Sequence, residues 1–386
     1  MRAVHTLRSA LPHRSGISQR VRNMTELPPS TPGGSSTHGA AAAPTASVAP
    51  AAPAIRVAEE VARALAVGRP VVALESTIFT HGLPRPRNLA VALEAEERLR
   101  EAGVVPATIG VHAGIPTVGL STEQITELSA IDGLDKVSLR DLPVVAALGR
   151  HGGTTVAATA FLAHRAGIRV FSTGGLGGVH FGASESFDES ADMTTLAATP
   201  VTVISAGVKS ILDIRATLER FETYNIPVIG YRTRKYPGFY VTDSGHEINF
   251  SVDSPEEAAK VIDARDRLDL PQAVLIANPV DPAKQLPPEE LDSILARAWA
   301  EAARQGITGN ASTPFLLDHI QRDTGGRSLE VNVEVYRGNV RLGGEIAIAL
   351  AGAAGPAASA GSTGPAPSAG PTRSAGASAS AAETGA

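Results

Sequence analysis

Short apolar runs alternate along the chain with longer stretches in which apolar residues recur every three or four positions. The short runs predict buried strands at residues 70–77, 106–111, 170–173, 201–205, 227–231 and 273–278. The longer stretches predict helices at 57–67, 88–102, 122–129, 154–166, 208–222, 255–267, 288–304 and 313–322. Such alternation of strands and helices predicts an α/β fold, in which a mostly parallel sheet is flanked by helices.

Both ends of the 386-residue chain depart from globular composition. Residues 27–54 and 352–386 consist mostly of Pro, Ala, Ser, Thr and Gly, which carry too little apolar volume to offset the entropy lost on ordering. We therefore expect a disordered extension at 1–54, a single folded domain at 55–351 and a disordered tail at 352–386. A domain of this length can bury a large core.

The first 25 residues hold five arginines and no acidic residue. This composition resembles that of an organellar transit peptide. The alternative is an overlong start, with Met24 rather than Met1 as the true initiator. We favour this second interpretation and expect a cytoplasmic protein, and under either interpretation the segment lies outside the fold.

Net charge and cysteine content exclude several classes of protein. The formal net charge of −5 gives no sign of a basic surface for nucleic acid. The absence of cysteine excludes disulfides, a thiolate nucleophile and a cysteine-ligated metal. No apolar run reaches the roughly 18 residues that a membrane span needs. We therefore expect neither nucleic acid nor a membrane as a partner.

Polar residues recur where the predicted strands end. They are Glu75, His112, Thr173, Lys209 and Asn278. Each of these residues, taken alone, is equally consistent with a helix cap or an ordinary surface residue. Ligands of parallel sheets, however, bind beyond the carboxyl ends of the strands, so several such residues together indicate a functional site at one rim.

Two of these residues have the chemistry of a catalytic pair. Lys209 follows an apolar run, and loss of hydration there would lower its pKa and favour the neutral amine that attacks a carbonyl carbon. Glu75 follows another apolar strand, where burial would raise its pKa and let it exchange a proton with a substrate. The alternative for Glu75 is a carboxylate that caps the next helix.

Glycines crowd residues 174–178, where backbone amides can approach a ligand closely. The segment is not a Walker A loop, because no Gly-Lys-Ser/Thr follows it, and its spacing excludes a dinucleotide fingerprint. The acidic loop after it holds Glu185, Asp188, Glu189 and Asp192. Such carboxylates suit a hard divalent cation such as Mg²⁺ or Mn²⁺, or form a merely solvated loop.

Eight collinear segments carry a resemblance to a known family. They are ALESTIFTHGLPRPRN, ATIGVHAGIPTVGLS, KVSLRDLP, GGTTVAATA, STGGLGGVHFGASESFDESADM, ISAGVKSILDI, ANPV and ASTPFLL. Together they closely resemble the pseudouridine-5′-phosphate glycosidase family over residues 57–350. The resemblance implies a C-glycosidase that reversibly converts pseudouridine 5′-phosphate and water to uracil and ribose 5-phosphate. It also implies a single α/β domain, a homotrimer and a divalent metal, typically Mn²⁺.

The resemblance assigns roles to particular positions. It implies that Glu75 is the proton donor, that Lys209 is the nucleophile, which would form a Schiff base with ring-opened ribose, and that Asp188 is the metal ligand. The implied substrate contacts are Lys136, Val156, Ser190, Ala191 and Asp192. It assigns no role to His81, His180 or Asn278, and His180 could ligate a metal, bind substrate or simply pack.

Two other classes of function fit the same residues. One is another Schiff-base lyase acting on a sugar phosphate, for which Lys209 and Glu75 alone would suffice. The other is a non-catalytic sugar-phosphate binding protein, which has no need of an unpaired lysine in an apolar pocket. Uracil release from pseudouridine 5′-phosphate separates the glycosidase from the first, and borohydride trapping of a covalent adduct excludes the second.

Overall fold

The computed structural model of the chain describes residues 54–307 and 312–353. The segments 1–53 and 354–386, which include nearly all of the two expected tails, lie outside the described residues. The folded part ends slightly later than expected, because the last helix continues to Ala353.

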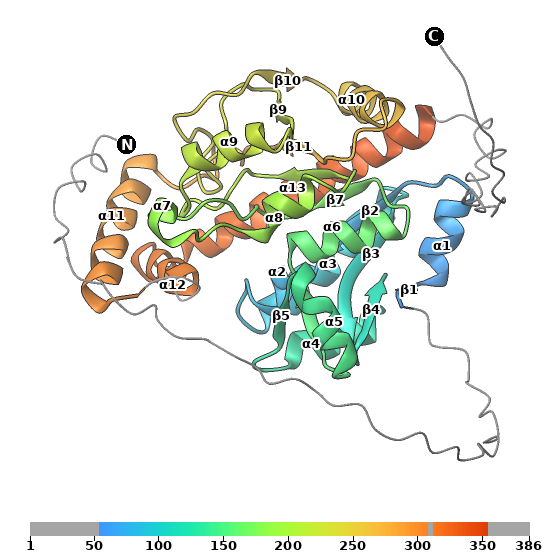
Figure 1. Cartoon of the computed structure of the whole chain (residues 1–386), viewed down its shortest axis with the longest axis horizontal. Coiled ribbons are helices and arrows are strands. Elements are labelled where there is room, and N and C mark those ends of the chain that lie inside the picture. Colours follow the sequence, from blue (N-terminus) through green and yellow to red (C-terminus); the bar gives the residue numbers. More distant parts are fainter. Residues whose placement is uncertain (1–53, 308–311, 354–386) are drawn as a thin grey trace, which may run out of the picture.

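An 11-stranded sheet forms the centre of the protein (Figure 1). Its strands are β1 (Arg56–Val57), β2 (Val71–Glu75), β3 (Val105–His112), β4 (Ile115–Val118), β5 (Asp135–Val137), β6 (Gly152–Thr154), β7 (Val170–Ser172), β8 (Thr202–Ser205), β9 (Val228–Tyr231), β10 (Phe250–Val252) and β11 (Val274–Ala277). The main path runs β1-β4-β3-β2-β7-β8-β11-β9-β10, and β6 joins β3 to β5. Two pairs, β3–β4 and β3–β6, are antiparallel and the others are parallel, which confirms the mostly parallel sheet.

Helices cover both faces of this sheet (Figure 1). They are α1 (Glu59–Ala66), α2 (Thr77–Thr80), α3 (Arg87–Glu101), α4 (Thr122–Ala130), α5 (Leu142–Ala147), α6 (Val156–Arg165), α7 (Ala183–Ser186), α8 (Ala191–Leu196), α9 (Ile214–Thr223), α10 (Pro255–Arg267), α11 (Pro288–Gln305), α12 (Ser312–Asp323) and α13 (Arg327–Ala353). One core lies under α1, α6 and α8, and the other under α3, α10 and α13.

Strand β2 shows why the strands are apolar throughout. Val71 and Ala73 point into the core under α6, whereas Val72 and Leu74 point into the core under α13. Because successive side chains of a strand face opposite sides, a sheet covered on both faces needs apolar residues at every position. This confirms the interpretation of the short apolar runs as buried strands.

Three expected helices begin later than the sequence pattern suggested. The helix expected at 154–166 starts at Val156, because Gly152–Thr154 form β6. Residues Arg56–Val57 pair with β4, so the first helix starts at Glu59 and not at Val57. The helix expected at 208–222 starts at Ile214, where the Asp213 side chain accepts a hydrogen bond from Ala216 N at 2.9 Å. This N-cap fixes the start of α9. Lys209 therefore lies in a loop and not on a helix.

Helix α13 crosses the sheet beside β7 and β8, and the sequence analysis did not predict it. Gly343 and Gly344 let α13 pack closely against β7 and α3. A Cβ on Gly343 would lie 2.0 Å from Ser172 Oγ, and one on Gly344 would lie 3.1 Å from a methyl of Leu99. The same approach brings Asn339 of α13 to the end of β7.

Candidate active site

The order of the central strands brings the polar strand ends to one rim. Strands β3, β2, β7, β8 and β11 are consecutive neighbours in the sheet, and each is parallel to the next. Their carboxyl ends therefore point the same way. Glu75 ends β2, Thr173 follows β7, and Lys209 lies four residues after β8.

Glu75 is buried and its carboxylate is held by two hydroxyls. The side chain is only 7% exposed, Thr173 Oγ1 donates to Oε1 at 2.5 Å, and Thr77 Oγ1 donates to Oε2 at 2.8 Å. Burial raises the pKa of Glu75 above its usual range, although the two hydroxyls and the nearby Lys209 ammonium lower it. A carboxyl with a raised pKa is suited to donating a proton near neutral pH.

Thr173 is itself fixed from the opposite side by α13. Asn339 is fully buried, and its Nδ2 donates to Thr173 O at 2.7 Å and to Gly174 O at 3.2 Å. Its Oδ1 accepts a hydrogen bond from Asn278 Nδ2 at 2.9 Å, at the end of β11. Thr173, Asn278 and Asn339 therefore form a polar support behind Glu75, which the sequence analysis did not identify. Thr173 and Asn278 were visible as strand-end residues, but nothing in the sequence linked them to Asn339.

Lys209 lies in the loop after β8 and is half-buried. Its backbone N donates to Leu176 O at 3.2 Å, and Gly207 before it adopts a left-handed φ of 78°. Within residues 54–307 and 312–353, its ammonium has no hydrogen bond or ion pair. Its charge nevertheless affects the pKa of Glu75, Lys136 and His180, so all three lie around it. An amine without a fixed partner is free to react.

Lys136 lies on β5 and reaches the same site. Its strand pairs with β6, with Lys136 opposite Gly153. The residue is exposed at the surface, yet desolvation by surrounding protein lowers the pKa of its ammonium, and the nearby Lys209 cation lowers it further. The carboxylates of Glu75 and Asp192 act in the opposite direction. The structure thus groups two lysines and two carboxylates in one place.

Asp192 joins two segments of the site. Its Oδ1 accepts from Ala157 N, in the first turn of α6, at 3.0 Å, and its Oδ2 accepts from Gly177 N at 2.8 Å. A carboxylate is stabilised at a helix N-terminus by these amides and by the helix dipole. We expected the glycine amides to face a ligand, but the Gly177 amide is already bound within the protein. Gly177 is required for packing, since a Cβ there would lie 2.2 Å from Ser190 Oγ.

The other expected substrate contacts lie beside Asp192. Val156 is buried as the first residue of α6, and Ala191 is the exposed first residue of α8. Ser190 precedes it and accepts a hydrogen bond from Asp192 N at 3.2 Å. Thr155 Oγ1, at the start of α6, is buried and has no hydrogen-bond partner among the described residues. This hydroxyl is available to a bound ligand.

Asp188 and His180 face each other across the acidic loop. His180 Nδ1 lies 3.9 Å from Asp188 Oδ2, and both side chains are partly buried. Burial lowers the pKa of His180, and the Asp188 carboxylate opposes this effect. Glu189 is engaged elsewhere, since Oε1 accepts from Arg220 Nη2 at 2.6 Å. A single carboxylate beside an imidazole fits a cation held largely by water, as Mn²⁺ and Mg²⁺ often are.

A second group of potential metal ligands lies apart from Asp188. His112, Glu127 and His151 are the one cluster of three such residues in the described part of the chain, and their ligand atoms all lie within 4.8 Å of one another. The sequence analysis listed His112 as a strand-end residue and did not connect it with the other two. The structure therefore does contain a candidate metal site, but the expected ligand Asp188 is not part of it.

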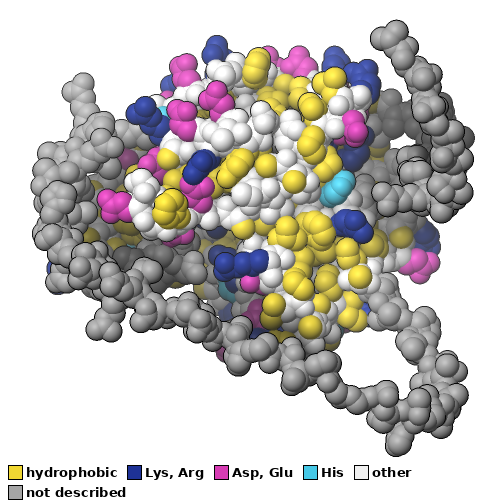
Figure 2. All heavy atoms as spheres, viewed as in Figure 1, with side chains coloured by type: hydrophobic (Ala, Val, Ile, Leu, Met, Phe, Trp, Pro, Cys, Tyr) yellow, Lys and Arg dark blue, Asp and Glu magenta, His cyan; other side chains and the backbone are white. Residues whose placement is uncertain are grey.

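The face of the protein drawn in Figure 2 carries charges of both signs and an apolar patch. In Figure 2, lysines, arginines and acidic residues are interspersed on the visible face, and apolar side chains gather over α5, where Val144 and Leu148 are exposed. None of the helices among the described residues combines the length and the apolar character needed to span a membrane.

Among the described residues, a lysine whose ammonium makes no hydrogen bond or ion pair and a buried carboxyl thus lie at one rim of a parallel sheet, where parallel sheets bind their ligands. The sequence model of the indigoidine synthase A-like protein family matches residues 60–349. The chain belongs to this family. The match agrees with the resemblance found in the sequence, because curated relatives of the chain are named pseudouridine-5′-phosphate glycosidases.

Two of these relatives and one solved structure show how far the likeness extends. The chain is 67% identical to the Saccharopolyspora erythraea protein over 296 residues, which cover 77% of this chain and 98% of the relative. It is 54% identical to the Salinispora tropica protein over 298 residues, which cover 77% of this chain and 92% of that relative. Among solved structures, the crystal structure of the prealnumycin C-glycosynthase AlnA in complex with ribulose 5-phosphate matches with a TM-score of 0.73. The two sequences are 37% identical, and the match covers 78% of this chain and 97% of that chain.

Proposed function

We propose that this chain is a pseudouridine-5′-phosphate glycosidase, which cleaves pseudouridine 5′-phosphate with water to uracil and ribose 5-phosphate, and reversibly so. The observation that carries the proposal is the joint position of Glu75 and Lys209 at one rim, in a chain that is 67% identical to a curated glycosidase of this name. The C-glycosynthase with a bound pentulose phosphate supports a sugar phosphate as the ligand class.

The bond to be broken explains the need for a lysine. Ordinary N-glycosides are cleaved by protonating the base and stabilising an oxocarbenium ion, usually with two carboxylates. Pseudouridine instead joins C1′ of ribose to carbon 5 of uracil, and carbon is a poor leaving atom. A lysine amine bonded to C1′ of the opened sugar supplies the electron pair that expels uracil, and the sugar is left as an imine.

Each step then has a group at the rim to perform it. Ring opening breaks the C1′–O4′ bond: O4′ takes a proton from Glu75, uracil N1 gives its proton to the resulting carboxylate, and the electrons shift through the base to form a C1′=C5 double bond. Lys209 Nζ then adds to C1′, and one of its protons passes to uracil N1, which restores the base. Cleavage of the C1′–C5 bond leaves its electron pair on uracil, where C5 takes a proton from Glu75, and the sugar remains as a protonated imine. Water then adds to C1′ and releases ribose 5-phosphate and the free lysine. Glu75 has the raised pKa that this proton transfer needs.

Cationic and amide donors are available for the phosphate. We propose that Lys136 and the start of α6 at Val156 bind it, with Thr155 Oγ1 as a further partner. Asp192 links the N-terminus of α6 to the loop that carries Gly177, because its carboxylate accepts hydrogen bonds from both. We propose that Ser190 and Ala191, next to Asp192, also contact the substrate. The backbone amide explains how the apolar Val156 can contact a phosphate.

We further propose that Asp188 holds Mn²⁺ through water, with His180 beside it. When bound, the cation would supply a positive charge that orients the substrate. Resemblance to the family supports a homotrimer and a cytoplasmic location, and size-exclusion chromatography with light scattering tests the trimer. All residues used in this proposal lie within 55–351, the stretch for which we propose a single catalytic domain.

The decisive assay is incubation of the purified chain with pseudouridine 5′-phosphate and Mn²⁺, followed by chromatographic detection of uracil and ribose 5-phosphate. Equal amounts of both products are expected. If other sugar phosphates were cleaved and this one were not, the chain would be a different Schiff-base lyase. Binding without any product would make it a sugar-phosphate binding protein.

A further inference from the structure

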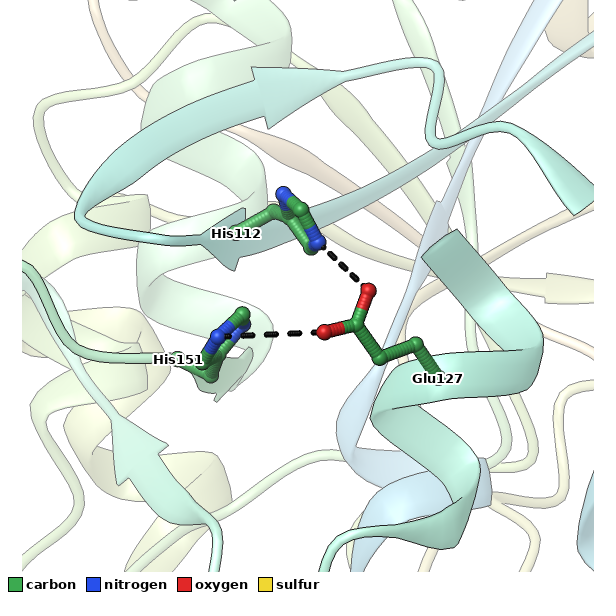
Figure 3. Close-up of side chains that lie close together, drawn as sticks. All are labelled: His112, Glu127 and His151. Atoms are coloured by element: carbon green, nitrogen blue, oxygen red, sulfur yellow. Dashed lines mark hydrogen bonds and ion pairs between the residues drawn. The ribbon is translucent and has the colours of Figure 1, made fainter. Parts of the chain in front are cut away.

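We propose that His112, Glu127 and His151 form a binding site for Zn²⁺ or a similar borderline divalent metal, separate from the site around Asp188. Figure 3 shows the two imidazole rings and the Glu127 carboxylate pointing toward one another from three different elements. His112 Nε2 lies 2.8 Å from Glu127 Oε2, and His151 Nε2 lies 4.0 Å from Glu127 Oε1.

The backbone places the two histidines opposite each other. Strands β3 and β6 are antiparallel, with Gly110 opposite Gly153 and Val111 opposite Gly152. His112 ends β3 and His151 directly precedes β6, so the two lie just beyond these pairs, and their ring centroids are 4.9 Å apart in an edge-to-face arrangement. The sheet, and not a mobile loop, therefore sets their separation.

Glu127 comes from α4, whose start is firmly fixed. The Ser121 side chain accepts from Gln124 N and the Gln124 side chain accepts from Ser121 N, which together form a capping box. The helix thus presents Glu127 to the two histidines from a stable position. The three ligands lie at the end of β3, on α4 and directly before β6, and so form a preorganised set.

The ligand set and its dimensions suit zinc. Two imidazoles and one carboxylate are a ligand combination of catalytic zinc sites, which leave a fourth position to water. Ligand atoms about 2.0–2.2 Å from a tetrahedral metal lie roughly 3.3–3.6 Å from one another. The distances of 2.8 and 4.0 Å from the histidine Nε2 atoms to the Glu127 carboxylate oxygens lie on either side of this range, so small side-chain rotations suffice. Mn²⁺ and Mg²⁺ prefer sites richer in oxygen.

Metal binding requires a proton shift within the His151 ring. His151 Nδ1 accepts a hydrogen bond from Ala113 N at 3.3 Å, so in the neutral ring the proton is on Nε2 and points toward Glu127. Coordination through Nε2 moves this proton to Nδ1 and gives up the long contact with Ala113. His112 and His151 are 21% and 30% exposed, so water can reach both rings and solvate the new N–H groups.

The position of the site gives a bound metal a structural role. It would tie α4 and the turn after β3 to β6, and β6 pairs with the strand that carries Lys136. Metal occupancy is therefore expected to stabilise this side of the protein. The ions at the two sites would differ in preference, with zinc at the histidines and the harder cation at Asp188.

The test is equilibrium dialysis of the tag-free, chelator-treated full chain against Zn²⁺, with the bound metal counted by mass spectrometry. The wild type is expected to bind one zinc ion. His112→Ala and His151→Ala should each bind this ion with at least 100-fold lower affinity. Glu127→Gln should weaken it by about 10- to 100-fold. His164→Ala, which removes an exposed histidine elsewhere, and Asp188→Ala should retain it.

Thermal unfolding gives a second measurement, which does not depend on counting the bound metal ions. Zn²⁺ should raise the Tm of the wild type and of His164→Ala, and should leave that of Glu127→Gln nearly unchanged. The metal-free Tm of each variant shows that it folds. Undiminished zinc binding by His112→Ala and His151→Ala would overturn the proposal, as would a wild type that binds no zinc. Loss of zinc in Asp188→Ala alone would place the metal at the other site.

Discussion

Thr173 Oγ1 donates a hydrogen bond to Glu75 Oε1 across two neighbouring strands, β7 and β2. The backbone of Thr173 is in turn bound by Asn339, which arrives from α13. Glu75 is thus positioned by a residue more than 250 positions away in the sequence, acting through one threonine. This link connects the last helix of the fold to the proposed proton donor.

Replacing Thr173 by valine keeps the shape of the side chain and removes the hydroxyl. Since this hydrogen bond lowers the pKa of Glu75, its loss should raise that pKa and keep Glu75 protonated to higher pH. The high-pH limb of the kcat/KM profile should therefore shift upward. A lost hydrogen bond to a charged group, about 1.5–3 kcal/mol, would lower kcat by roughly 10- to 100-fold.

Ser172→Ala is the matched control, because Ser172 is equally buried and bonds to Asn339 O but does not contact Glu75. Its pH profile should match that of the wild type. An unchanged profile in Thr173→Val would show that Thr173 does not tune Glu75.

Glu75 should also make stability depend on pH. Its pKa is raised above 4.5 in the folded protein, so the folded state retains a proton that the unfolded state has lost. The contribution of Glu75 is fully present below about 4.5 and is lost as pH rises through the folded pKa. Urea unfolding of Glu75→Gln should show the variant gaining stability relative to wild type across this window. A constant difference at all pH values would contradict the raised pKa.

Asp192 should contribute to stability as well as to the site. In Asp192→Asn, one oxygen that accepts a backbone N–H becomes an NH₂ group, which leaves a buried donor unpaired. The expected loss is about 1–3 kcal/mol in the free energy of unfolding. Asp188→Asn is the control, because among the described residues no backbone amide donates to its side chain. Equal stability of both variants would argue against the Asp192 link.

Asp188→Ala should reduce turnover and its response to Mn²⁺ without unfolding the protein. A cation held largely through water organises a site more than it supports a fold. The measurement is uracil formation over a range of Mn²⁺ concentrations, together with the Tm of the metal-free protein. Full activity with an unchanged manganese response would exclude Asp188 as the ligand.

Much of this arrangement could be predicted from the sequence. Glu75, Thr173 and Lys209 each follow a buried strand, and parallel strands end at a common rim, so their convergence follows from the alternating pattern. The apolar runs also predicted six strands, β2, β3, β7, β8, β9 and β11, to within about two residues, because a sheet covered on both faces requires apolar side chains at every position. The short strands β1, β4, β5, β6 and β10 were not predicted.

The remaining features depend on tertiary contacts. Asn339 lies on a helix whose pattern is interrupted by Gly343 and Gly344, and only packing against Ser172 of β7 and Leu99 of α3 explains those two glycines. The carboxylate of Asp192 could not be placed at the start of α6 from its position in an acidic loop. The pairing of His112 with His151 required knowledge of the β3–β6 register.

The central claim is that Lys209 forms the covalent bond to the sugar. Lys209→Ala should abolish turnover, a loss of several powers of ten at about 1.4 kcal/mol of barrier for each, while the fold and much of the substrate affinity remain. Lys209→Arg should be equally inactive, because a guanidinium stays protonated and forms no imine. The most direct measurement is the intact mass of the protein after borohydride reduction in the presence of ribose 5-phosphate. The account predicts one reduced sugar-phosphate adduct on the wild type, located at Lys209 by peptide mapping and absent from both variants. An adduct located at Lys136, or a fully active enzyme that gives no adduct, would contradict it.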